Sequence, residues 1–126
     1  MKVSISEHLN WKLDCITVGP LDMNAWIIYS NAIDSAILVD PGEEPDVLLR
    51  AIEKTKCKLT AIICTHGHFD HIGAAADIQK VWDLPLIAHE EGESVIENMQ
   101  IAQANYGFPR TELPEIDYYS GNKIIE

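Results

Sequence analysis

Three histidines and one aspartate fall within six residues in the middle of the chain, in the stretch Thr65-His66-Gly67-His68-Phe69-Asp70-His71. In an extended chain residues 66, 68 and 70 share one side, and His71 follows at the start of the next element. The four side chains can therefore converge on one volume. Imidazole and carboxylate donors suit zinc, and also iron or manganese, better than calcium or magnesium, which prefer oxygen ligands. We therefore predict a metal site made by His66, His68, Asp70 and His71.

The alternative is that these histidines are solvated loop residues and that Asp70 caps a helix, as aspartate often does. Three neighbouring imidazoles would repel one another once protonated, whereas a bound metal ion holds them neutral. The sequence therefore favours the metal site.

The elements that must position this stretch follow from the periodicity of the apolar residues. Residues 15–18, 25–29 and 36–39 are apolar runs separated by turn residues, which predicts an antiparallel meander. Residues 43–56, 72–82 and 90–104 have helical periodicity, and they alternate with strand-like runs at 59–64 and 85–88. This alternation predicts an α/β (α+β) fold, in which helices cover a mixed sheet. The last helix would bury a stripe made by Val95, Ile96, Met99 and Ala102.

Composition limits the functions that are open to the chain. We expect residues 1–126 to form a single domain, and the net charge of −11 disfavours binding to nucleic acid or to anionic membranes. The apolar runs have only strand length and the first ten residues lack the pattern of a secretory signal, so we expect a cytoplasmic protein. The three cysteines form no Cys-x-x-Cys pair, and we expect Cys64 to be a small buried residue at a strand end rather than a reactive thiol.

The pattern His-x-His-x-Asp-His, after a buried strand and a threonine, resembles the signature of the metallo-β-lactamase superfamily. The surrounding sequence is similar to the hydroxyacylglutathione hydrolase (glyoxalase-II-like) branch of that superfamily. The similar segments are Asn24-Ala25-Trp26-Ile27-Ile28, Leu38-Val39-Asp40-Pro41-Gly42, Ile72-Gly73-Ala74-Ala75 and Ala88-His89-Glu90.

This resemblance implies an αββα sandwich of two similar halves that holds two zinc ions, with iron or manganese as alternatives. By the resemblance, His66 and His68 bind the first ion, Asp70 and His71 bind the second, and Asp70 also acts in catalysis by orienting the nucleophile. The implied reaction is hydrolysis of a small thioester or related acyl substrate by a metal-bound hydroxide.

The same resemblance exposes a departure from the family pattern. Each ion would have two protein donors from this stretch, whereas a catalytic zinc usually has three. In the family the remaining ligands come from a C-terminal half, which would begin just beyond Glu126. We therefore expect the chain to represent the N-terminal half of the sandwich, and to be a homo-oligomer or to associate with a chain that supplies the other half.

Two other functions stay open from the sequence. The chain could be a non-catalytic half-domain that works by association, or an oxidoreductase of the iron persulfide dioxygenase type, which shares the same motif. His68 argues against a diiron flavoprotein, because that branch tends to carry glutamate at this position.

Two further residues have open roles. His89 follows a strand candidate, so it either approaches the metal ions from the same sheet edge or lies peripherally at the start of a helix. Asp40 either orients a ligand imidazole, as carboxylates near metal sites often do, or simply forms a turn.

Overall fold

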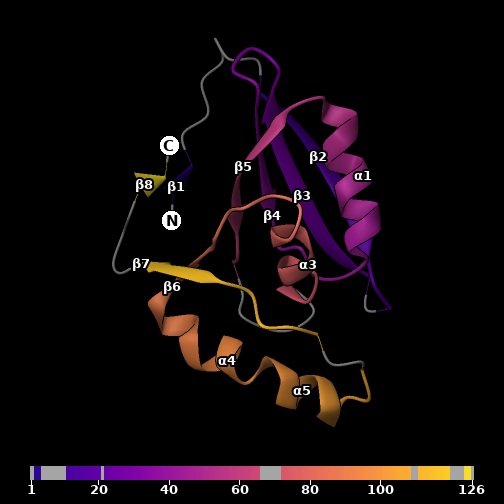
Figure 1. The fold of residues 1–126 in the computed structure, drawn as a ribbon, viewed down its shortest axis with the longest axis vertical. Coiled ribbons are helices and arrows are strands. Elements are labelled where there is room, and N and C mark those ends of the chain that lie inside the picture. The colour runs from indigo at the N-terminus through magenta and orange to yellow at the C-terminus, as the bar shows by residue number, and fades with distance from the viewer. Residues whose placement is uncertain are drawn as a thin grey trace.

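The fold is built around a six-stranded mixed sheet (Figure 1). In this computed structural model the described residues are 2–3, 11–20, 22–65, 72–108, 111–119 and 124–125. The sheet has the order β2-β3-β4-β5-β6-β7, and a separate two-stranded parallel sheet pairs β1 (Lys2–Val3) with β8 (Ile124–Ile125). The six strands are β2 (Lys12–Val18), β3 (Met23–Ser30), β4 (Ser35–Val39), β5 (Lys58–Ile63), β6 (Leu86–His89) and β7 (Ile116–Tyr119).

The predicted antiparallel meander is confirmed by the pairing of β2 with β3 and of β3 with β4. Strand β2 begins at Lys12, three residues before the apolar run that predicted it. Because β2 is the edge strand and its first residues are exposed, polar side chains such as Lys12 and Asp14 fit there without burial.

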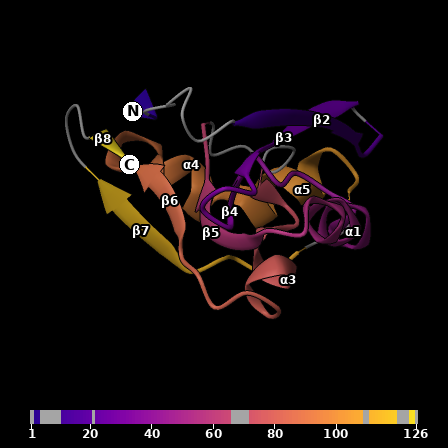
Figure 2. The same cartoon turned by 90° about the horizontal axis from the view of Figure 1, so that it is seen from above.

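The second half of the sheet is parallel, and a helical segment connects each strand to the next. Right-handed crossovers of this kind place their helices on the same face of a sheet. Figure 2 shows α1 and α3 together on one side of it. The expected mixed sheet with helices covering it is confirmed. The helical segments are α1 (Pro45–Thr55), α3 (Ala75–Gln79), the 3-10 turn η2 (Glu90–Gly92), α4 (Glu93–Glu97) and α5 (Met99–Asn105).

The hydrophobic core lies between the sheet and these helices. One row of side chains crosses four neighbouring strands in register, and all four members are completely buried. Helix α1 contributes Leu48 and Ile52, and α5 contributes Met99. Burying such side chains stabilises the fold by roughly 1.5–3 kcal/mol each. The row consists of Ile27, Leu38, Ile62 and Leu86.

Two helix predictions need correction. The helix expected over residues 90–104 is divided into η2, α4 and α5. Between α4 and α5 the Asn98 side chain donates to the Ser94 carbonyl at 2.7 Å, beside the bond from the Asn98 N–H to the same carbonyl, and local side-chain bonds of this kind often bend helices. Of the expected stripe, Ile96 and Met99 are buried and Ala102 packs half-buried against the core, but Val95 is 39% exposed. The helix expected over residues 72–82 is shorter, and α3 ends at Gln79.

The cysteines agree with the expectation, since Cys15, Cys57 and Cys64 are not joined in disulfides and Cys64 is buried beside the end of β5. Within the described part of the chain, no helix has the length and apolar character needed to cross a membrane.

Strand β7, which periodicity does not predict, is held in place by glutamine side chains. The Gln103 amide accepts from the Thr111 backbone N–H at 3.0 Å and donates to the Thr111 hydroxyl at 2.8 Å. The Gln79 amide likewise accepts from the Glu115 N–H at 2.9 Å and donates to the Glu115 carbonyl at 2.7 Å. Both clamps order the segment that leads into β7.

We predict that Gln103→Ala lowers the free energy of unfolding by about 1–3 kcal/mol. Gln103 is 2% exposed, and its loss would leave the Thr111 N–H without this partner. Urea unfolding measures the effect, and Asn105→Ala, an exposed amide on the same helix, serves as the control. Equal stability of the two variants would contradict the role of the clamp.

Candidate metal centre

The four predicted metal ligands, His66, His68, Asp70 and His71, lie outside the described residues. Both flanks of the segment are described. It leaves β5 through Cys64 and Thr65, at the carboxyl end of a parallel strand, and it leads into the buried Ile72. Open α/β sheets bind ligands at this edge. The described flanks therefore lie at the sheet edge expected for the motif, while the ligands themselves stay a prediction.

The entry to the segment is fixed by Asp40, which directly follows β4. Its carboxylate accepts the Thr65 backbone N–H at 2.7 Å through Oδ1 and the Thr65 hydroxyl through Oδ2. The Asp40 N–H in turn donates to the Ile63 carbonyl at 2.9 Å. These bonds hold the residue immediately before His66 in one position. The sequence analysis did not identify this role of Thr65.

The exit from the segment is fixed by Pro41, the residue that follows Asp40. Its carbonyl accepts the Ala74 backbone N–H at 2.9 Å, and Ala74 is almost fully buried. Adjacent residues of one turn therefore hold both ends of the predicted metal loop.

Asp40 adopts a left-handed backbone conformation with φ of 54°. Aspartate and asparagine tolerate this region better than most residues. The side chain is buried, and burial of a carboxylate is costly unless it is hydrogen-bonded. Asp40 therefore does more than form a turn, because its bonds to Thr65 position the loop. Its second proposed role, the orientation of a ligand imidazole, stays a prediction.

His89 ends β6 and reaches the same sheet edge, one of the two positions expected for it. Its Nδ1 accepts the Glu91 backbone N–H at 3.1 Å. A neutral ring with this bond carries its proton on Nε2, which leaves no lone pair there for a metal ion. This geometry favours the peripheral role at the start of a helical turn.

Among the described residues, no three His, Cys, Asp or Glu side chains come together to hold a metal ion. A metal centre in this chain therefore needs ligands from outside the described residues, which is where the predicted donors lie. Three imidazoles and one carboxylate are a chemically suitable set for zinc, iron or manganese.

A cavity of about 200 Å³ lies beside the entry to the predicted metal loop. Tyr118 pairs in register with Ala88 of the lining. Burial raises the pKa of the Tyr118 hydroxyl, and the Glu93 and Glu97 carboxylates and Cys64 raise that pKa further. The cavity is lined by Cys64, Thr65, Ala88, His89, Glu91, Gly92 and Ile96.

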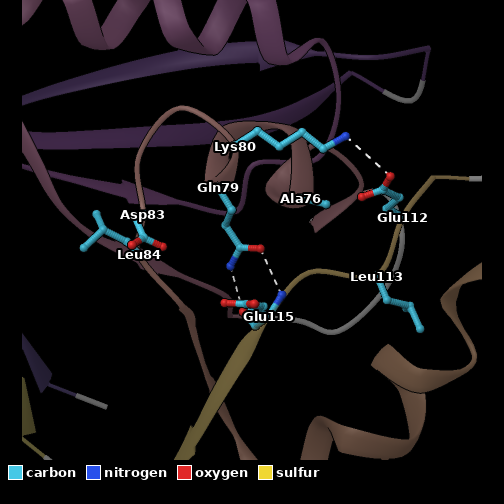
Figure 3. A pocket seen from close by; sticks show the side chains of 8 residues that line it. All are labelled: Ala76, Gln79, Lys80, Asp83, Leu84, Glu112, Leu113 and Glu115. Carbon is cyan, nitrogen blue, oxygen red and sulfur yellow. Dashed lines mark hydrogen bonds and ion pairs between the residues drawn. The ribbon is translucent and has the colours of Figure 1, made fainter.

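A second cavity, of about 340 Å³, lies at the opposite edge of the sheet (Figure 3). It is lined by residues that precede β6 and β7, such as Leu84 and Glu115, and it contains the ion pair of Lys80 with Glu112 at 3.4 Å. Its polar groups largely serve structure, since the Gln79 clamp crosses it. This cavity therefore lies away from the predicted metal loop.

The family model described as "Metallo-beta-lactamase superfamily" matches residues 18–100. The chain belongs to this superfamily. Among curated relatives, it is 37% identical over 73 residues to the probable metallo-hydrolase YqgX of Bacillus subtilis (strain 168), which covers 58% of this chain and 34% of the relative. It is 27% identical over 117 residues to the hydroxyacylglutathione hydrolase GloC of Haemophilus influenzae (strain ATCC 51907 / DSM 11121 / KW20 / Rd), covering 90% of this chain and 55% of the relative.

Solved structures agree with this assignment. The metallo-β-lactamase superfamily chain superimposes with a TM-score of 0.75 on TTHA1623 in a di-iron-bound form, at 31% identity, covering 86% of this chain and 54% of that one. The B3 metallo-beta-lactamase BLEG-1 gives the same TM-score at 26% identity, covering 89% and 54%. The chain thus spans about half the length of these proteins or less, and it corresponds to their N-terminal part.

We predict that Asp40→Asn weakens metal binding by about 10–100-fold, because the loop entry loses an acceptor for Thr65 while the left-handed turn is kept. Asp34→Asn is the matched control. Asp34 also has a left-handed φ, of 50°, and accepts a β5 backbone N–H, that of Lys58 at 3.0 Å, but at the other end of the strand. Isothermal titration with zinc measures both variants, and equal weakening in both would contradict a local role of Asp40.

Proposed function

We propose that this chain carries the metal-binding half of a binuclear, zinc-type hydrolase that acts on thioesters or related small acyl compounds. The observation that carries the proposal is the position of the segment with His66, His68, Asp70 and His71. Both of its ends are held by Asp40 and Pro41 at the carboxyl edge of the parallel strands. Two relatives support the hydrolase class, since their names are metallo-hydrolase and hydroxyacylglutathione hydrolase. Iron is the main alternative metal, because TTHA1623 has a di-iron-bound form. A cytoplasmic location stays a prediction from the sequence.

In this proposal His66 and His68 hold the first ion, and Asp70 and His71 hold the second. Bound ions of this kind lower the pKa of a water molecule and polarise an acyl carbonyl. The chain's own residues do the positioning. Asp70 orients the attacking water by accepting a hydrogen bond from it, and Asp40 keeps Thr65, and so the loop entry, in place.

We predict about two zinc ions per chain on the size-exclusion peak, and hydrolysis of an acyl thioester that a chelator abolishes.

Asp70→Asn should lower kcat roughly 10²–10⁴-fold. His66→Ala should lower the metal content, whereas His89→Ala should leave it unchanged, since His89 Nδ1 already accepts a backbone N–H. Metal content near zero together with no hydrolysis would reject the proposal, and oxygen uptake by an iron-loaded chain would favour a dioxygenase instead.

Our second proposal is that a second copy of this chain covers the bare face of the sheet, the face opposite the helices. Two rows of apolar side chains cross this face in register, and none of them is charged. Ile37 and Ile63 are buried, while the other five side chains are half-buried. The rows are Trp26, Val39, Ile63 and Ile87, and Ile28, Ile37 and Ala61.

Charge supports a second copy as the occupant. The chain carries a net charge of −11, so two copies that meet through acidic surfaces repel each other. The central rows of this face carry no charge, although the exposed Asp117 continues the first row at the sheet edge in register with Ile87, and a twofold contact requires a self-complementary patch.

We expect light scattering to give a mass of about twice 14.1 kDa for the wild-type chain. Trp26→Glu should dissociate the dimer by placing a charge on the bare face. Val81→Glu is the control and should stay dimeric, since Val81 is already 62% exposed and lies among helical residues on the other side of the sheet. A wild-type chain that is monomeric up to millimolar concentration would overturn the proposal.

A further inference from the structure

The cavity beside the predicted metal loop is placed where one end of a substrate would lie. It opens at the carboxyl ends of the neighbouring parallel strands β5 and β6, where the Cys64 N–H donates to the Ile87 carbonyl at 2.9 Å. Thr65 lines it and is bonded directly to His66. A group bound in this cavity would therefore be next to the first predicted metal ligand.

The walls of the cavity indicate what it can hold. Cys64, Ala88 and Ile96 are nearly buried and form its floor, while exposed polar residues such as Thr65 and Glu91 make up much of its accessible wall. The volume of about 200 Å³ is below the range of 300–1,000 Å³ that is usual for the pocket of a whole ligand. The cavity therefore suits a short chain, as one part of a larger substrate.

The charges around the cavity narrow the choice further. The carboxylate of Glu91 belongs to its lining, and no lysine or arginine is among the described residues that line it. Glu93 and Glu97 lie near enough to raise the pKa of Tyr118. A second carboxylate, at the far end of a bound chain, would be repelled here.

We propose that this cavity binds the acyl chain of the substrate, and that it selects short uncharged acyl groups over acyl groups that end in a carboxylate. The inference rests on the proposed hydrolase function, because only then does the reacting carbonyl lie at the predicted metal loop.

Binding can be measured without hydrolysis, by ¹⁵N–¹H NMR of the full chain. Butyramide is an uncharged probe, and succinamate is its counterpart with a terminal carboxylate. We expect butyramide to shift the amide signals of Ala88 and Gly92 in a saturable way, and succinamate to bind more weakly by roughly two- to five-fold, a difference that falls at high salt. No saturable shift at these amides, or equal binding of both probes, would overturn the inference.

Two variants test the walls and the charge separately. Glu91→Gln should remove most of the difference in affinity between butyramide and succinamate. Glu112→Gln, the same substitution at the opposite sheet edge, should leave that difference unchanged. Gly92→Val should weaken butyramide binding, because a Cβ at Gly92 meets no atom within 4 Å and so extends into open space. Ala104→Val, at an exposed position of α5, is its control. A Glu91→Gln variant that keeps the full difference, or equal effects of the two valine variants, would count against the inference.

Hydrolysis of butyryl and succinyl thioesters of the same thiol links the cavity to the reaction. We expect wild-type kcat/KM to be higher for the butyryl ester than for the succinyl ester. Glu91→Gln should lower the ratio of these two kcat/KM values by the same factor by which it lowers the ratio of the two probe affinities measured by NMR. Butyramide binding without hydrolysis of either ester would reject the hydrolase function while leaving the cavity's selectivity intact. Hydrolysis with no preference between the esters would reject the acyl-chain assignment alone.

Discussion

The arrangement of the site depends on one short turn, Asp40-Pro41, at the end of β4. Through its carboxylate Asp40 holds Thr65, and through its N–H it holds the Ile63 carbonyl, while Pro41 holds Ala74 beyond the predicted metal loop. A buried carboxylate is unfavourable unless it is hydrogen-bonded, so this geometry exists only while β4 and β5 lie side by side. The turn thereby makes the position of the loop a consequence of sheet pairing.

The two edges of the parallel part of the sheet differ in the residues that they bring together. The carboxyl edge holds the loop entry, His89 and the smaller cavity. The opposite edge holds structural contacts, namely the Gln79 clamp on Glu115 and the Lys80–Glu112 ion pair. Because all parallel strands run in one direction, their carboxyl ends gather at one edge and leave the other free for such contacts. This division explains why the cavity that contains the Lys80–Glu112 ion pair is not the candidate site.

The two faces of the sheet differ as well. The row from Ile27 to Leu86 is fully buried under the helices, whereas the row from Trp26 to Ile87 is mostly half-buried and uncharged. Alternate residues of a strand point to opposite faces, so strands that are apolar at every position can supply both surfaces. In a chain with a net charge of −11, the uncharged centre of this face is the surface best suited to contact another polypeptide.

The sequence alone determined the features that depend on residue type and local spacing. The apolar runs and turn residues predicted the meander and α1, and the His-x-His-x-Asp-His pattern predicted both the kind of metal site and the superfamily. These features are local, because periodicity and donor chemistry can be recognised within a few residues.

Only the tertiary structure decided the features that depend on distant partners. The expected helix is interrupted at Asn98, and Val95 is exposed. Strand β7 forms where Gln79 and Gln103 hold Glu115 and Thr111, in the segment that leads into the strand. Asp40 meets Thr65 across 25 positions, and His89 is turned from a possible ligand into a hydrogen-bond acceptor by the backbone of Glu91. The Asp40–Thr65 and Gln79–Glu115 contacts need elements that only the folded sheet brings together, whereas the Asn98 and His89 contacts are short-range hydrogen bonds that apolar periodicity does not encode.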